Sequence, residues 1–326
     1  MAFVPTSPQT SLHGTFTARP AHRCSVQRPR TVHRQALRMQ TWSDPAVTQE
    51  YFDFLNNVNQ RELMTDCTST IVGSGRIGNF LREHGTGQDL VIRRGQKIPE
   101  DAPGPVYLCT RNDDLEEIIE NCPESKKDDL VFIQNGMLER MLRRHDMSEN
   151  TRANLYFAIS KMDADPIDGI TETNPEGLTA VCGKWEGAFQ ERILKAGLTC
   201  KILKERDFRR SQLEKLIWIS VFNLIGAVHG NIPMGEVAQM HEREVTELSI
   251  ELAHMIRFTL TVGMLPDIEK RMLAYGRRVK EFPTALKEFE WRNGFFYKYS
   301  MLARKNGFPD PTPMHTYVLV CSSYAR

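Results

Sequence analysis

The sequence predicts an α/β domain over residues 66–205, followed by an all-α domain over residues 206–326. Three observations predict this division. Short β-branched runs alternate with helical patterns up to about Glu205, and a glycine-rich turn follows the first run. Beyond that point the strand patterns stop while the helical patterns continue. Strands that alternate with helices favour a mostly parallel sheet with helices on both faces.

The first domain reads as seven strands and four helices. Apolar or β-branched runs of strand length occur at 70–72, 89–92, 105–110, 129–136, 154–160, 177–183 and 199–203. Helical patterns follow the glycine-rich turn directly and recur at 113–122, 136–147 and 184–197. Asp113 and Asp114 are well placed to favour the positive N-terminal end of the second of these helices.

The second domain reads as helical throughout. Its helical patterns cover residues 207–229, 234–263, 265–280 and 284–306, and "HTYVLV" at 315–320 suits a strand or a helix equally. Ligands of open α/β sheets bind outside the carboxyl ends of the strands. We therefore expect the functional site in the crevice between the two domains.

Residues 1–43 differ in composition from the rest of the chain. They contain six arginines, ten Ser or Thr residues and four prolines, but no lysine and no acid. This composition is typical of an organelle transit peptide, with a disordered tail as the alternative. The first twenty residues are hydroxylated and nearly uncharged, which favours the plastid (chloroplast) stroma over a mitochondrion or the cytoplasm. Residues 44–65 predict a lead-in helix.

Several functional classes find no support. Beyond residue 43 the chain has 36 basic and 41 acidic residues, which gives no reason to expect a nucleic-acid partner. It has no apolar stretch of the roughly 18–20 residues that span a membrane. The seven cysteines lack CxxC spacing, as expected of reduced thiols. "HEREV" at His241 lacks the second histidine of a zinc helix, so we expect no metal site.

The stretch "GSGRIG" places Gly73, Gly75 and Gly78 in the GxGxxG spacing, between a strand and a helix. In such a turn the glycines permit the tight bend, the approach of a pyrophosphate and the close packing of the helix. The helix N-terminus then offers free N–H groups to the phosphates. The context predicts a Rossmann-type dinucleotide site, and an ordinary strand-to-helix turn is the alternative.

The end of the second strand indicates which dinucleotide is bound. An NAD site has an acid about 20 residues after the first glycine, where this sequence has Arg93 and Arg94. Two guanidiniums suit a 2′-phosphate, because they can bind it in a fork and neutralise its charge. Arg111, which ends the third strand, could close the same pocket. The sequence predicts NADP(H), with a solvated loop as the alternative for the arginine pair.

One apolar helix, "LEKLIWISVFNLIGAVHG", carries a lysine. Lys215, Ile219 and Asn223 fall on one stripe, because side chains four residues apart stack on a helix. Taken alone, Lys215 reads as the solvated edge of a core helix. A cation beside a ketone, however, stabilises the charge that hydride delivery places on the oxygen, and it can donate a proton.

Four stretches in the same order resemble the ketopantoate reductases (2-dehydropantoate 2-reductases). They are "GSGRIG", "LVFIQNGM" (130–137), the lysine helix with its Gly-Glu end, and the final segment 286–313. The resemblance covers most of residues 68–320. It implies a divergent member with a Rossmann-type domain, a helical C-terminal domain like that of 6-phosphogluconate dehydrogenases, and a link to pantothenate biosynthesis.

The resemblance also implies roles for individual residues. Lys215 would be the general acid, Asn223 would hydrogen-bond the substrate, and Glu288 would orient the lysine or a substrate hydroxyl. Asn135 would lie by the nicotinamide and the substrate. A solvated helix residue is the alternative for Glu288, and a strand-end turn is the alternative for Asn135.

The cofactor residues carry over in the same way. Arg93 or Arg94, together with Arg111, would hold the 2′-phosphate. The pyrophosphate would lie on the turn and the start of its helix, at Gly73, Ser74, Gly75, Arg76, Ile77 and Gly78.

The sequence also departs from the family pattern at three places. Ile219 stands where a second asparagine is usual, and Gly276 stands where a serine precedes the glutamate. Only 17 positions separate Arg94 from Arg111, too few for the helix and extra strand expected there. A different or bulkier 2-keto acid than ketopantoate fits an apolar Ile219 better.

Taken together, the sequence predicts an NADPH-dependent reductase of a small 2-keto acid. Two alternatives stay open: an NADP(H)-binding sensor or scaffold without turnover, and a related reductase acting on an imine or a β-hydroxy acid. The aromatic segment "WRNGFFYKY" suits a homodimer surface or simple core packing.

Overall fold

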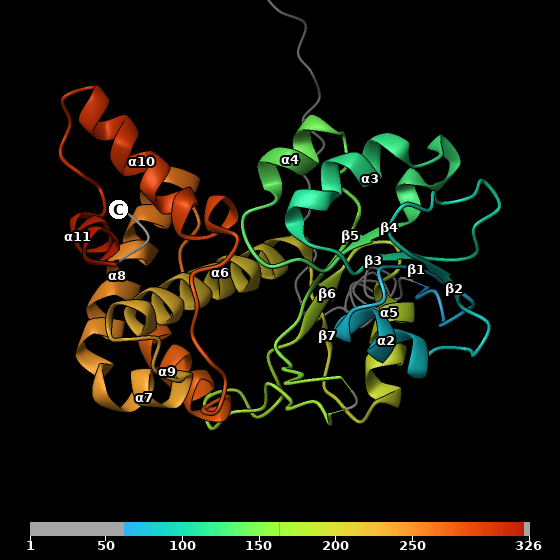
Figure 1. Cartoon of the computed structure of the whole chain (residues 1–326), viewed down its shortest axis with the longest axis horizontal. Helices are drawn as coiled ribbons and strands as arrows, with labels where there is room; N and C mark the ends of the chain where they lie inside the picture. The colour runs from blue at the N-terminus through green and yellow to red at the C-terminus, as the bar shows by residue number, and fades with distance from the viewer. Residues whose placement is uncertain (1–61, 163, 323–326) are drawn as a thin grey trace, which may run out of the picture. The chain divides into compact units, whose positions relative to one another are not determined.

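The computed structural model describes residues 62–162 and 164–322, which form a sheet-containing part followed by a helical part (Figure 1). Seven strands make one sheet in the order β2-β1-β3-β4-β5-β6-β7. They are β1 (Thr70–Val72), β2 (Leu90–Ile92), β3 (Val106–Leu108), β4 (Leu130–Phe132), β5 (Thr151–Asn154), β6 (Ala180–Cys182) and β7 (Lys201–Ile202). Strands β1 to β5 are parallel, and β6 runs antiparallel to β5. The predicted mostly parallel sheet is confirmed.

Helices cover both faces of this sheet. Neighbouring residues of a strand point to opposite sides, and apolar residues lie on both sides. Ile71 belongs to the core under α2 (Arg76–Glu83) and α5 (Glu186–Lys195). Val72 belongs to the core under α3 (Leu115–Asn121) and α4 (Glu139–Arg144). Two 3-10 turns, η1 (Asn112–Asp114) and η2 (Glu124–Asp129), flank α3. Because both faces of the sheet are buried, most strand sequences are continuous apolar runs.

The helical part is built around one long helix, α6 (Glu205–Val228), which extends from the sheet into the helical part (Figure 1). Every residue from Leu213 to Gly226 is buried, as expected of a helix that is apolar all round. The other elements of this part are α7 (Met234–Met240), α8 (Glu242–Leu260), α9 (Ile268–Arg278), η3 (Phe289–Trp291), α10 (Asn293–Lys305) and α11 (Pro313–Cys321). None of the described helices is long and apolar enough to cross a membrane.

Some predicted elements were wrong in their bounds. The fifth strand lies at β5, and the expected strand 154–160 leaves the sheet after its first residue, where the Tyr156 N–H donates to the Thr179 hydroxyl instead of a neighbouring strand. The helical pattern 234–263 is two helices that meet at His241. The pattern 284–306 is helical only from η3 onward. Residues 315–320 are helical, and most of the lead-in helix and all of residues 1–43 lie outside the described residues.

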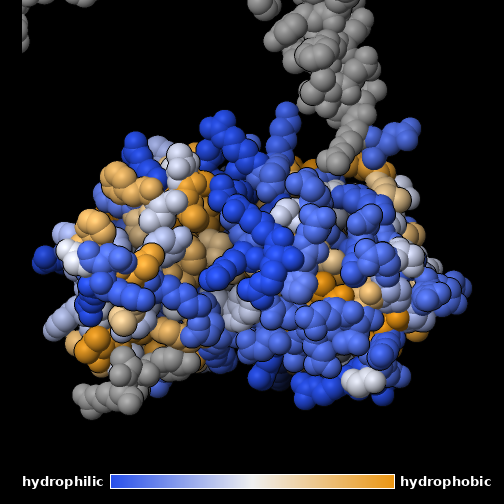
Figure 2. Space-filling view, turned by 90° about the horizontal axis from the view of Figure 1, so that it is seen from above, coloured by the Kyte–Doolittle hydropathy of each residue, from blue (hydrophilic) through white to orange (hydrophobic). Residues whose placement is uncertain are grey.

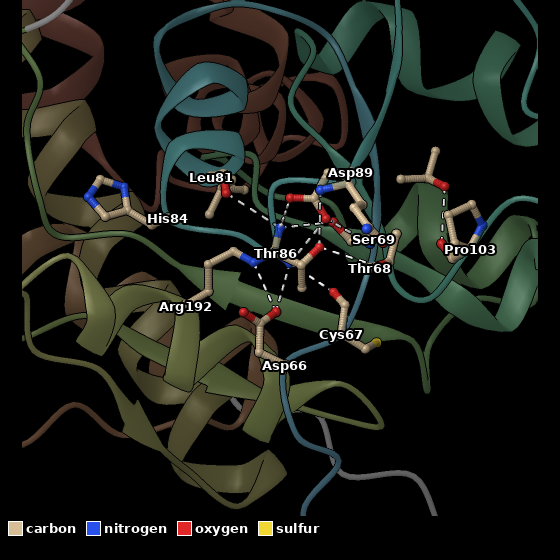
Figure 3. Close-up of polar contacts among 12 residues, drawn as sticks. Asp66, Cys67, Thr68, Ser69, Leu81, His84, Thr86, Asp89, Pro103 and Arg192 are labelled. Carbon is tan, nitrogen blue, oxygen red and sulfur yellow. Dashed lines mark hydrogen bonds and ion pairs between the residues drawn. The ribbon is translucent and has the colours of Figure 1, made fainter.

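A buried ion cluster ties the start of β1 to α5 (Figure 3). Arg192 is fully buried and bonds two carboxylates, Asp66 at 2.7 Å and Asp89 at 3.1 Å, which are 1% and 0% exposed. The same guanidinium donates to the Ser69 hydroxyl and the Cys67 carbonyl. Because α5, β1 and the loop before β2 all contribute, this cluster fixes the end of the sheet opposite the carboxyl ends of the parallel strands.

The aromatic segment that begins α10 serves more than one purpose. Phe296 is fully buried in the helical core. Trp291, Phe295 and Tyr299 instead line a surface hollow of about 550 Å³ beside α4. Figure 2, which views the molecule from above, shows hydrophobic side chains gathered over the helical half and mostly hydrophilic ones over the other half. Core packing therefore accounts for only part of the segment.

Candidate active site

The glycine-rich turn after β1 has a tight, closely packed backbone. Gly73 has a φ of +101°, a left-handed conformation that strains other residues, and a Cβ there would lie 2.7 Å from the Cys109 carbonyl oxygen. A Cβ on Gly78 would lie 2.0 Å from the Gly73 carbonyl oxygen, so α2 lies directly against the turn. Nothing described lies within 4 Å of a Cβ placed on Gly75, the N-cap of α2. The backbone there is open to a phosphate.

A cavity of about 700 Å³ lies at this turn, and we call it the glycine-turn cavity. The arginines expected at the 2′-phosphate, Arg93, Arg94 and Arg111, all line it, as does Lys97. Lys97, which follows the two arginines in the loop after β2, was not predicted as a site residue from the sequence. The cavity therefore combines open backbone N–H groups with a cluster of cations, which suits a phosphorylated nucleotide.

A second cavity of about 410 Å³ adjoins the first, and we call it the lysine cavity. The two share their lining at five residues: Arg76, Ile77, Cys109, Thr110 and Arg111. The remaining wall comes from the carboxyl ends of β3 and β4, the segment after β5, helices α6, α7 and α9, and the segment before η3. Lys215, Asn223, Asn135 and Glu288, which lie far apart in the sequence, all line this cavity. The sheet and the helical part therefore meet where the sequence predicted a site.

Lys215 is buried in the wall of the lysine cavity. It is 6% exposed, so the interpretation of Lys215 as a solvated edge was wrong. Its Nζ lies 4.8 Å from the centre of the Tyr156 ring, and it has no acidic partner among the described residues. Burial, and after it the positive charge of Arg292, lowers the pKa of Lys215 to about 7. A lysine with this pKa can both hold and release a proton near neutral pH.

Glu288 connects the helical part to the sheet part. It has a left-handed backbone (φ 48°), accepts a hydrogen bond from the Asn112 N–H at 3.2 Å, and pairs with Nη2 of Arg292 at 2.5 Å. Its carboxylate therefore already has two partners, and neither is Lys215. Arg292 was not predicted as a site residue from the sequence, although it stands only four residues after Glu288.

The two asparagines are tied to the protein itself. Asn223 donates to the Ile219 carbonyl oxygen at 2.7 Å and accepts from the Ala285 N–H at 2.9 Å, so it anchors the segment before Glu288 to α6. Asn135 lies in the turn after β4, where its carbonyl oxygen accepts a hydrogen bond from Asn112. Both side chains line the lysine cavity, but Asn223 has only part of its hydrogen-bonding capacity left for a ligand.

The lysine cavity is strongly cationic. Five of its lining residues are basic and one is acidic: Arg76, Arg111, Lys215, Lys287, Arg292 and Glu288. Much of the remaining wall is apolar, with Trp218, Ile219 and Tyr275 among its residues. Such a lining suits a small anion with an apolar body.

A separate histidine cluster lies outside both cavities. His229 follows α6 and His241 precedes α8, and their rings stack with centroids 3.7 Å apart. Each ring hydrogen-bonds one oxygen of Glu244, at 3.1 and 2.8 Å. The three ligand atoms lie within 4.8 Å of one another. Residue spacing did not reveal this grouping, because His229 belongs to a different helix from "HEREV".

No protein-family model and no curated protein matches the sequence. Solved structures do match, among them a 2-dehydropantoate 2-reductase from Methylococcus capsulatus (TM-score 0.57, 13% identity, 78% of this chain and 95% of that chain). A dimeric ketopantoate reductase from Staphylococcus aureus is similar, with a TM-score of 0.54 and 14% identity over 80% of this chain and 100% of that chain. So is D-mandelate dehydrogenase with NADH and anilino(oxo)acetate (TM-score 0.56, 13% identity, 78% and 97%).

The chain has the fold of the ketopantoate reductases. Within this fold, the three departures noted in the sequence have clear structural consequences. Ile219 lines the lysine cavity, so an apolar side chain lies in its wall where the family pattern has an amide. A Cβ on Gly276 would lie 2.3 Å from the Phe222 ring, so this position packs α9 against α6 and does not line the cavity. The described chain between β2 and β3 has neither helix nor strand.

Proposed function

We propose that the protein is an NADPH-dependent reductase that converts a 2-keto acid to a 2-hydroxy acid, with Lys215 as the general acid. The observation that carries the proposal is the buried Lys215, which lacks an acidic partner among the described residues, lines a cavity adjoining the glycine-turn cavity and has a pKa lowered to about 7. The NADH bound to D-mandelate dehydrogenase, which has a similar fold, supports a nicotinamide cofactor here.

The residues of the two cavities fit NADPH. Gly73, Ser74, Gly75, Arg76 and Ile77 would hold its pyrophosphate, while Gly78 lets α2 pack against the turn. Arg93, Arg94 and Arg111 would hold its 2′-phosphate. When bound, NADPH supplies the hydride that adds to C2 of the keto acid. Lys215 stabilises the negative charge that develops on the carbonyl oxygen, and its Nζ gives up the proton that completes the hydroxyl group.

The lysine cavity favours a 2-keto acid with an apolar side chain. Ile219 offers no hydrogen bond, and Asn223 and Glu288 already bond other groups of the protein. A hydroxylated side chain such as that of ketopantoate would find no amide at position 219, and removing its hydroxyl group from water would cost free energy. Apolar substrate groups would instead lie against Trp218 and Tyr275.

The proposal is tested by incubating the purified protein with NADPH and a panel of 2-keto acids whose side chains range from methyl to phenyl. Oxidation of NADPH that depends on one of these acids is expected. If NADPH binds but no acid is reduced, the function is that of an NADP(H)-binding sensor or scaffold. Activity with imines alone would assign a different reductase of the same fold.

Cofactor selectivity gives a first prediction. NADPH should raise the melting temperature more than NADH at equal concentration, because only NADPH engages the arginines after β2. Replacing both Arg93 and Arg94 by alanine should weaken NADPH binding by roughly tenfold or more, the scale of one lost charged hydrogen bond, and leave NADH binding unchanged. The matched control is Arg82→Ala on α2, outside the cavity. Equal shifts for the two cofactors in the wild type would contradict the assignment.

Substrate choice gives a second prediction, at Ile219. Ile219→Asn restores an amide to the cavity and should raise the ratio of kcat/KM for ketopantoate over kcat/KM for an apolar keto acid by about tenfold, the value of one hydrogen bond. Ile219→Val changes size without adding polarity and serves as the control. A ratio that stays the same in both variants would show that Ile219 does not contact the substrate.

The cellular context of this activity is also a proposal. The composition of residues 1–43 supports a plastid precursor whose first segment is removed. The aromatic residues of α10 that line a surface hollow support a homodimer. Import of a fluorescent fusion and light scattering of the purified protein, respectively, test these two points.

A further inference from the structure

We propose that Arg292 binds the carboxylate of the substrate, so that the enzyme acts on 2-keto acids and rejects their esters and amides. This inference rests on the proposed function and names its substrate class. Arg292 precedes α10 and lines the lysine cavity together with Lys215. Its side chain is 12% exposed, so it is a nearly buried cation in the wall of the cavity.

The hydrogen bonds of Arg292 are incomplete. A guanidinium carries five N–H donors, and a buried one is costly unless these donors are used. Within the described chain the side chain donates only to Glu288, through Nη2, and its Nε is buried without a partner. The guanidinium therefore retains donor capacity for an acceptor that enters the cavity. A carboxylate is the acceptor that matches the planar fork of arginine best.

The other cations of the cavity are less suited to this task. Arg76 already donates to the carbonyl oxygens of Ile159 and Ser160. Arg111 also lines the glycine-turn cavity, where a nucleotide phosphate would bind it. Lys287 is exposed. Apart from Lys215, which is assigned to the ketone, Arg292 is the described cation that is both nearly buried and incompletely bonded in this wall.

The pairing of Lys215 with Arg292 matches the chemistry of a 2-keto acid. Such a molecule has a ketone and a carboxylate on adjacent carbons, so two neighbouring cations can take one group each. The charge of Arg292 is close enough to lower the pKa of Lys215. A carboxylate on Arg292 would offset this charge and keep the lysine protonated. Binding of the keto acid would thus keep Lys215 protonated, whereas a neutral ester or amide would not.

The test compares wild type, Arg292→Leu and Arg292→Lys with a 2-keto acid and its methyl ester. Loss of a buried charged pair should lower kcat/KM for the acid by ~10²-fold in Arg292→Leu and leave that for the ester within a few-fold of wild type. Arg292→Lys should recover part of the loss. In Arg292→Leu the fall of kcat/KM at alkaline pH should move to higher pH. Arg304→Leu, on the exposed side of α10, is the control.

Binding without turnover separates the inference from the proposed function. An N-phenyl oxamate is an unreactive analogue of a 2-keto acid, and calorimetry in the presence of NADPH measures its affinity directly. Wild type should bind it and Arg292→Leu should not, while both bind NADPH equally, which also shows that the variant is folded. Equal affinity of the two proteins for the oxamate, or equal loss of ester and acid reduction, overturns the role of Arg292. Failure of wild type to reduce any keto acid instead overturns the proposed function.

Discussion

Replacing Lys215 with methionine is expected to lower kcat for the best 2-keto acid by ~10²-fold or more, the usual scale of lost acid catalysis. Methionine preserves the length and apolar contacts of the lysine stem but cannot donate a proton. NADPH binding should be unchanged, because Lys215 does not line the glycine-turn cavity. Steady-state kinetics together with an NADPH titration check both expectations. Unchanged turnover would remove Lys215 from the mechanism.

The pH dependence of the wild type belongs to the same prediction. The general acid must be protonated, and the pKa of Lys215 is lowered to about 7. The value of kcat/KM should therefore fall as the pH rises above about 7, because the free enzyme loses this proton. A profile that stays level up to pH 10 would contradict the assignment.

In Lys215→Met the activity should fall while the stability of the folded state stays the same or rises. The folded protein binds fewer protons than the unfolded chain between about pH 7 and 10.5, so burial of Lys215 destabilises the folded state most at and below neutral pH. Lys215→Met removes this penalty. Its melting temperature at pH 6 should equal or exceed that of wild type, which shows that the loss of activity is not a loss of fold.

Replacing Arg192 with methionine should destabilise the protein by about 3–5 kcal/mol, the cost of removing one partner of a buried ion pair. Asp89 would be left buried without a cation, and Asp66 would keep only the half-exposed Lys195 (Figure 3). The free energy of unfolding of a protein domain is only about 5–15 kcal/mol, so this loss is a large share of it. Urea unfolding followed by circular dichroism measures it.

A matched control lies on the same helix. Lys195 also pairs with Asp66, at 2.5 Å, but it is 49% exposed. Lys195→Met should cost at most about 1 kcal/mol, because water screens an exposed ion pair. Similar effects of the two substitutions would mean that the cluster is not what holds α5 to the start of β1. Under conditions where Arg192→Met is folded, its KM for the keto acid should match that of wild type.

The fold was predictable where one sequence pattern corresponds to one structure. The β-branched run 70–72, the glycines after it and the amphipathic helix that follows are local features, so their arrangement could be inferred. Errors occurred where side chains compete with the backbone. The segment after Asn154 is as apolar as a strand, yet the Thr179 hydroxyl takes the N–H of Tyr156, and the chain leaves the sheet.

The candidate site was predictable in part for similar reasons. Lys215 and Glu288 came from a resemblance in sequence order, and the structure places both in one cavity. The burial of Lys215 could not be read from its helix alone, because a lysine on an apolar face is as often solvated. Arg292 was overlooked because nothing in "EWRNG" tells whether the arginine points outward or into the cavity. The histidine cluster was overlooked because it joins the ends of two helices.

Transfer of a deuterium label tests the central claim most directly. The protein is incubated with NADPH that carries two deuterium atoms at C4 of the nicotinamide, together with a mixture of apolar 2-keto acids, and the products are analysed by mass spectrometry. We expect a 2-hydroxy acid with one deuterium at C2, formed by wild type and strongly reduced in Lys215→Met. NADPH that binds tightly, as seen by calorimetry, while no keto acid acquires the label would contradict the account.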